Sequence, residues 1–153
     1  MGAIRVTARR YSFEVLREEA ELPYPRGTVV AGPRDIVEIA RRLIGADISE
    51  VILAFFFDAR QRVTGHCEVA RGTLNAARLT PRDILVRALA VNAASVAVAH
   101  NHPSGSETPS RADRQVTAVI RDACALVGIP LLDHVIVTDT AHHSFRETEG
   151  WGC

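Results

Sequence analysis

The stretch VAVAHNHPSGSETPSRAD, residues 96–113, decides the fold prediction because it joins an apolar run to a turn and a new helix. The run ends at His100 and His102, and side chains at i and i+2 on a strand point to the same side. A segment rich in proline, glycine and serine follows, and Ser110 and Asp113 then begin the next predicted helix. The stretch therefore predicts a strand, a turn and a helix start that together present two imidazoles and a carboxylate.

Strands and helices are mixed along the rest of the chain. An early hairpin and later strand–helix–strand units indicate one α/β domain with a mixed β-sheet flanked by helices. Strands are expected over residues 11–16, 51–58, 63–72, 95–100 and 130–139, and helices over residues 33–43, 81–92 and 110–127. The tail after residue 141 is expected to form a short strand and a loose end. We divide the chain into an N-terminal arm or edge strand, residues 1–34, and a domain over residues 35–150.

Composition limits the classes of function. The formal net charge is zero, which disfavours strong non-specific binding to nucleic acid, because that depends on Lys and Arg neutralising phosphates. The cysteines number three and form no C-x-x-C pair, so a reducing compartment is expected. The longest apolar run, VILAFFF, is too short to cross a membrane, and no signal peptide is evident. We therefore expect a cytoplasmic protein with no membrane partner.

The histidines and the aspartate of the opening stretch form a candidate zinc site. Zinc binds imidazole nitrogen and carboxylate oxygen at about 2.0–2.2 Å, and three protein ligands with one open position are typical of catalytic zinc. His100, His102 and Asp113 supply three ligands. The alternative interpretation is structural: H-x-H is common polar surface, and Ser110-x-x-Asp113 is also a helix-capping pattern. The two interpretations are compatible, since the cap can fix the turn that presents Asp113.

The spacing of these residues resembles a known signature. H-x-H, seven residues and S-x-x-D resemble the motif of the JAB/MPN (JAMM) zinc metallopeptidase superfamily. The longer string AHNHPSG…TPSRAD, with FFFDARQRV, GTLNAA, LLDHVIV and SFRE, is similar to the RadC-like branch over about residues 35–150. The resemblance implies a JAB/MPN-like, cytidine-deaminase-like architecture.

The resemblance also implies a chemistry and its residues. His100, His102 and Asp113 would bind Zn²⁺, and the hydroxyl of Ser110 would help to hold the oxyanion of the transition state. Glu50, directly before VILAFFFD, stands where the family has its general base, although the residues alone make it only an exposed carboxylate at a strand start. Glu68, on the return strand of the hairpin, is the competing candidate. The implied activity is hydrolysis of a peptide or isopeptide bond in a peptide or protein substrate.

Other functions remain as alternatives. The name of RadC-like proteins points to a DNA-repair or nuclease-like role, but nucleic acid is the less favoured partner because the chain is neutral. Residues 1–34 are also too short for the helix-hairpin-helix region that RadC-like proteins often carry. A non-catalytic module is opposed by the intact set of His100, His102 and Asp113. His134, inside an apolar strand, is expected to pack or to support the site rather than to bind metal, and the edge strand over residues 11–16 could pair two subunits in a homo-oligomer.

Overall fold

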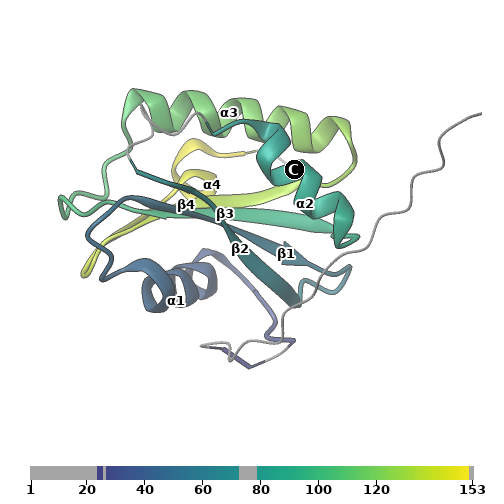
Figure 1. The fold of residues 1–153 in the computed structure, drawn as a ribbon, viewed down its shortest axis with the longest axis horizontal. Helices are drawn as coiled ribbons and strands as arrows, with labels where there is room; N and C mark the ends of the chain where they lie inside the picture. The colour runs from purple at the N-terminus through teal and green to yellow at the C-terminus, as the bar shows by residue number, and fades with distance from the viewer. Residues whose placement is uncertain (1–23, 26, 73–78, 152–153) are drawn as a thin grey trace, which may run out of the picture.

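The fold is a mixed five-stranded sheet with helices on both faces (Figure 1). The computed structural model describes residues 24–25, 27–72 and 79–151. The elements are α1 (Pro33–Ile44), β1 (Val51–Phe57), β2 (Val63–Arg71), α2 (Pro81–Ala90), β3 (Ser95–Asn101), α3 (Arg111–Leu126), β4 (Leu131–Val137), β5 (His142–Ser144) and α4 (Phe145–Glu149). The strand order is β2-β1-β3-β4-β5, and among the strands of the described residues only the β3–β4 pair is parallel. The predicted α/β class is confirmed.

The central strands β1 and β3 are buried along their whole length, and their side chains alternate between two cores. Figure 1 shows α1 on one side of the sheet and α2 and α3 on the other. The α1 side contains Ile36, Val37, Ala40, Leu53, Phe55, Phe57, Ala97 and Ala99. The α2/α3 side contains Ile52, Ala54, Phe56, Ile84, Ala88, Val96, Val98, Ile120 and Cys124. Continuous apolar strands are expected where both faces of a sheet are covered.

The parallel pairing of β3 with β4 positions the candidate site. Parallel strands need a crossover connection, and here α3 provides it. The chain leaves β3 at Asn101, turns, and enters α3 at Arg111, so the N-terminus of α3 lies beside the carboxyl end of β3. In this register His100 lies opposite Ile52 of β1 and Ile136 of β4.

The tail departs from the prediction. The expected loose end after the short strand is wrong, because residues 145–149 form α4. Ser144 begins this helix by accepting a 3.1 Å hydrogen bond from the backbone N–H of Glu147, and Phe145 is completely buried. A cap and one buried aromatic ring therefore stabilise a helix that is too short for sequence periodicity to reveal.

The strand expected over residues 11–16 lies outside the described residues. Residues 24–25 and 27–34 of the expected arm are described, and among them Tyr24 and Val30 are buried in the α1-side core. Within the described ranges, no helix has both the length and the apolar character needed to cross a membrane.

Candidate metal centre

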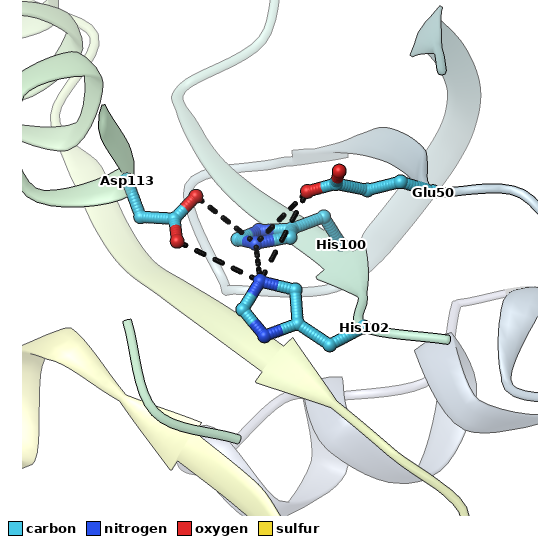
Figure 2. A group of neighbouring side chains, drawn as sticks. All are labelled: Glu50, His100, His102 and Asp113. Atoms are coloured by element: carbon cyan, nitrogen blue, oxygen red, sulfur yellow. Dashed lines mark hydrogen bonds and ion pairs between the residues drawn. The ribbon is translucent and has the colours of Figure 1, made fainter. Parts of the chain in front are cut away.

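Four side chains from three segments meet at the carboxyl end of β3 (Figure 2). One ligand atom from each of Glu50, His100, His102 and Asp113 lies within 4.8 Å of the others. We call these residues the four-residue cluster. The Nε2 atoms of His100 and His102 are 2.9 Å apart, and Asp113 Oδ1 is 3.3 Å from Nε2 of His100. The structure thus brings together the three ligands predicted from the sequence and adds the predicted base.

The two histidines converge because the strand and the turn after it hold them. His100 is completely buried at the end of β3, whereas the His102 side chain is 14% exposed just beyond it. The turn closes with a 3.0 Å hydrogen bond from Gly105 N–H to the carbonyl of His102. Gly105 has a φ of +83°, which favours glycine. The turn brings the carbonyl of Ser106 within 2.7 Å of His102 Nδ1, and since a carbonyl only accepts, Nδ1 carries the proton.

Asp113 combines a helix-capping role with a place in the cluster. Its Oδ2 accepts a 2.6 Å hydrogen bond from Ser110 N–H, and Ser110 Oγ accepts a 3.1 Å bond from Asp113 N–H. This reciprocal pair is a capping box, and an acid in the first helical turn also faces the positive end of the helix dipole. The other oxygen, Oδ1, is buried and accepts no hydrogen bond within the described part of the chain. The cap therefore uses Oδ2, which also lies 3.6 Å from Nε2 of His102, and leaves Oδ1 directed at His100.

Glu50, and not Glu68, belongs to the cluster. The side chain of Glu50 is 16% exposed, and its Oε1 lies 3.8 Å from Nε2 of His100 and 3.9 Å from Nε2 of His102. Glu68 instead forms an ion pair of 2.8 Å with Arg71 on β2. The residues alone could not separate these two carboxylates, because each stands directly before an apolar strand residue, Val51 or Val69.

Ser110 stands at the N-cap of α3 and is exposed to solvent. Its oxygen accepts from Asp113 N–H, which leaves its own hydroxyl hydrogen free to donate to another group. The structure thus assigns Ser110 a capping bond without consuming the hydrogen that the predicted oxyanion role requires.

The electrostatics of the cluster favour a bound cation. Burial opposes ionisation of Asp113, but the adjacent imidazoles of His100 and His102 outweigh burial and hold the pKa of Asp113 well below its usual range. Asp113 in turn raises the pKa of His102, against the effect of burial. The cluster combines an ionised carboxylate, one oxygen of which is buried and unbonded, with two imidazole nitrogens only 2.9 Å apart. Carboxylate oxygen and imidazole nitrogen are the ligands that transition metals such as zinc bind.

A second layer of polar residues supports the cluster. His134 Nε2 lies 2.7 Å from His100 Nδ1, and Thr117 Oγ1 lies 2.5 Å from His134 Nδ1. Burial lowers the pKa of His134 well below its ordinary value. The expectation that His134 supports the site rather than joining the ligands agrees with this geometry. Thr117 was not singled out by sequence reasoning, although its helical spacing from Asp113, four residues on, places both on one face of α3.

The fold and the cluster define the class of protein. The sheet presents two histidines at the end of a central strand, an aspartate at the start of the next helix and a glutamate before the neighbouring strand. This arrangement is that of a JAB-type domain. A family model described as "RadC-like JAB domain" matches residues 30–151. The chain belongs to this family.

Curated relatives agree with this assignment and state no activity. The chain is 43% identical over 149 residues to a UPF0758 protein of Burkholderia mallei (strain SAVP1), covering 97% of this chain and 50% of that protein. It is 41% identical over 149 residues to a UPF0758 protein of Vibrio cholerae serotype O1, covering 95% of this chain and 93% of that protein. The chain thus spans about half the length of the Burkholderia relative and nearly all of the Vibrio relative.

Proposed function

We propose that this chain is a Zn²⁺-dependent hydrolase that cleaves peptide or isopeptide bonds. The single observation that carries the proposal is the convergence of His100, His102 and Asp113 with a separate carboxylate, Glu50, within 4.8 Å. Two imidazoles and one carboxylate are a common catalytic ligand set for zinc, in which a fourth position stays open for water or substrate. Glu50 is the most exposed of the four side chains, at 16%, and can reach solvent that enters the site.

The residues divide the chemistry between them. A zinc ion supplies Lewis acidity, which polarises a carbonyl and makes water a stronger acid. Glu50 Oε1 accepts the proton of the attacking water and passes it to the leaving amine, as a general base and then a general acid. The free hydroxyl hydrogen of Ser110 donates to the oxyanion as negative charge develops on it. Asp113, whose side chain is 1% exposed, would hold the ion together with His100 and His102.

The test separates metal binding from proton transfer. Purified wild-type protein is loaded with Zn²⁺ and screened against a library of peptides and isopeptide-linked peptides. We expect stoichiometric zinc and cleavage in the wild type, and neither in His100→Ala. Glu50→Gln should keep zinc and lose about 10²–10⁴-fold in rate, the usual worth of general acid–base catalysis.

Glu68→Gln is the matched control, because Glu68 is paired with Arg71 outside the cluster. It should cleave at the wild-type rate. A Glu50→Gln variant that cleaves as fast as wild type would refute the role of Glu50, and wild-type protein without bound zinc would refute the proposed function as a whole.

A further inference from the structure

A chain of hydrogen bonds, called the relay below, runs from the backbone of α3 through the buried side chains of Thr117 and His134 to His100. Thr117 Oγ1 lies 2.6 Å from the carbonyl oxygen of Asp113 and 2.5 Å from His134 Nδ1. His134 Nε2 lies 2.7 Å from His100 Nδ1. Thr117, His134 and His100 are each at most 2% exposed, so no solvent is available to share these bonds.

The first bond fixes the direction of the others. A carbonyl oxygen can only accept, so the hydrogen between Thr117 Oγ1 and the carbonyl of Asp113 belongs to the Thr117 hydroxyl. This is the i to i−4 bond that threonine commonly makes within a helix. A hydroxyl has one hydrogen, and therefore Thr117 Oγ1 can only accept from His134. The proton between them must lie on Nδ1 of His134.

The same reasoning continues to the cluster. A charged imidazolium is costly in a dry interior without a paired carboxylate. The ring of His134 contacts Thr117, His100 and Phe145, while the carboxylate of Asp133 bonds to other groups. With one proton, on Nδ1, His134 presents a bare Nε2. The 2.7 Å contact then requires His100 to donate from Nδ1. With one proton, on Nδ1, His100 directs its Nε2 lone pair at the group formed by His102 Nε2 and Asp113 Oδ1.

We propose that Thr117 and His134 are positioning residues that fix His100 in the tautomer whose Nε2 lone pair faces the four-residue cluster. The inference rests on the proposed function only in taking the cluster as a metal site. A histidine ligand usually donates its second N–H to a carboxylate, a carbonyl or water. Here a second histidine takes that place, and the carbonyl of Asp113 sets its direction through Thr117. The backbone carbonyl of Asp113, one predicted ligand, thereby determines the tautomer of His100, another predicted ligand.

Packing of the His134 ring holds the side chains of the relay in place. The ring of His134 stacks on Phe145 of α4, with centroids 5.0 Å apart and planes 15° from parallel. His134 lies on β4, directly beside β3 in the sheet, and Thr117 lies on α3 above it. The three side chains of the relay thus come from three different elements, α3, β4 and β3, so the final tautomer depends on the assembled fold.

The first test reads the protons directly in metal-free wild-type protein. Long-range ¹H–¹⁵N correlation spectra distinguish the nitrogen that carries the proton in each imidazole, and His134→Gln assigns the His134 signals by their loss. We expect His134 to be neutral with its proton on Nδ1. A proton on Nε2 of His134, alone or in a doubly protonated ring, would overturn the relay.

The second test measures Zn²⁺ affinity by competition with a chromophoric chelator. Thr117→Val removes the acceptor for His134 and should weaken Zn²⁺ binding by about 10–100-fold, the usual effect of losing a residue that supports a metal ligand. Thr117→Ser keeps the hydroxyl and should bind as wild type does. Equal affinity in wild type and Thr117→Val would overturn the proposal.

The chain offers a matched control in α4. Thr148 Oγ1 also donates to the carbonyl four residues earlier, at 2.7 Å, and lies 3.0 Å from a histidine nitrogen, His143 Nε2. His143 is not in the four-residue cluster, so Thr148→Val should leave Zn²⁺ affinity unchanged. If the wild type binds no Zn²⁺, the proposed function fails. The ¹H–¹⁵N spectra of metal-free protein still show which nitrogen of His134 carries the proton, so they test the relay independently.

Discussion

Asn101 and Val51 are joined by a buried 2.7 Å hydrogen bond, in which the side-chain oxygen of Asn101 accepts from the backbone N–H of Val51. The side-chain nitrogen of Asn101 donates to the carbonyls of Asp47, at 3.2 Å, and Ser49, at 2.9 Å. These three backbone groups surround Glu50 in the sequence. The end of β3, where the two histidines lie, therefore also fixes the segment that carries the proposed base.

Replacing Asn101 should separate the base from the metal ligands. Asn101→Ala leaves the buried N–H of Val51 without a partner, which costs about 1–3 kcal/mol in the free energy of unfolding. Urea unfolding measures this cost. We also expect slower hydrolysis at unchanged Zn²⁺ affinity, because the displaced residue is Glu50 rather than a histidine. A loss of Zn²⁺ affinity as large as the loss of rate would show instead that Asn101 acts through its neighbours His100 and His102.

Ser110 should contribute both to stability and to rate. Ser110→Ala removes the N-cap bond to Asp113 N–H, for a cost of about 1 kcal/mol in the free energy of unfolding. It also removes the proposed oxyanion donor, so the rate should fall about 10²–10³-fold with zinc retained. Thr80→Ala is the control, since the Thr80 hydroxyl bonds to Asp83 at the start of α2. If both variants slow hydrolysis equally, Ser110 acts only through the stability of its helix.

Zinc should stabilise the fold, and Asp113 should be required for this. At a free Zn²⁺ concentration about 100 times the dissociation constant, the free energy of unfolding should rise by about 2.7 kcal/mol, and a chelator should reverse the gain. Asp113→Asn keeps an oxygen that can accept from Ser110 N–H but removes the negative charge beside His100. We expect a folded variant with little zinc-induced stabilisation. Undiminished stabilisation of Asp113→Asn would remove Asp113 from the ligands.

The parts of the site that the sequence predicted are those that local geometry determines. The i, i+2 spacing of His100 and His102 and the cap that includes Asp113 depend only on a strand end and a helix start. The roles of Asn101 and Thr117 could not be predicted in this way. They arise because β3 pairs with β1 on one side and β4 on the other, and such long-range register is not encoded in any short stretch.

The separation of Glu50 from Glu68 has the same origin. Both precede or follow apolar strand residues, and only the antiparallel pairing of β1 with β3 places the start of β1 beside the end of β3. Glu68 lies on β2, the outer neighbour of β1, where it pairs with Arg71. The structure places Glu50, which the family resemblance implies as general base, in the four-residue cluster. Its role as general base stays a prediction, which the variants proposed above test.

Tyr24 gives the fold a stability that depends on pH at alkaline values. Its hydroxyl lies 2.7 Å from His66 Nδ1, the residue is 6% exposed, and burial raises its pKa from 10.0 to about 12. The folded protein therefore keeps a proton that the unfolded chain releases above pH 10.0, so the stability from Tyr24 is complete below that pH and is lost as the pH rises toward 12.

Tyr24→Phe isolates this effect, because phenylalanine keeps the ring and cannot titrate. Below pH 10.0 the wild type should exceed the variant by about 0.5–1.5 kcal/mol in the free energy of unfolding, the net worth of one hydrogen bond. That advantage should shrink as the pH rises toward the pKa of Tyr24 in the folded protein. The rise in tyrosinate absorbance that reports ionisation of Tyr24 should be absent from the variant. An advantage that stays constant over this range would mean that the Tyr24 hydroxyl ionises as readily in the folded protein as in the unfolded chain, and burial against His66 would then not protect its proton.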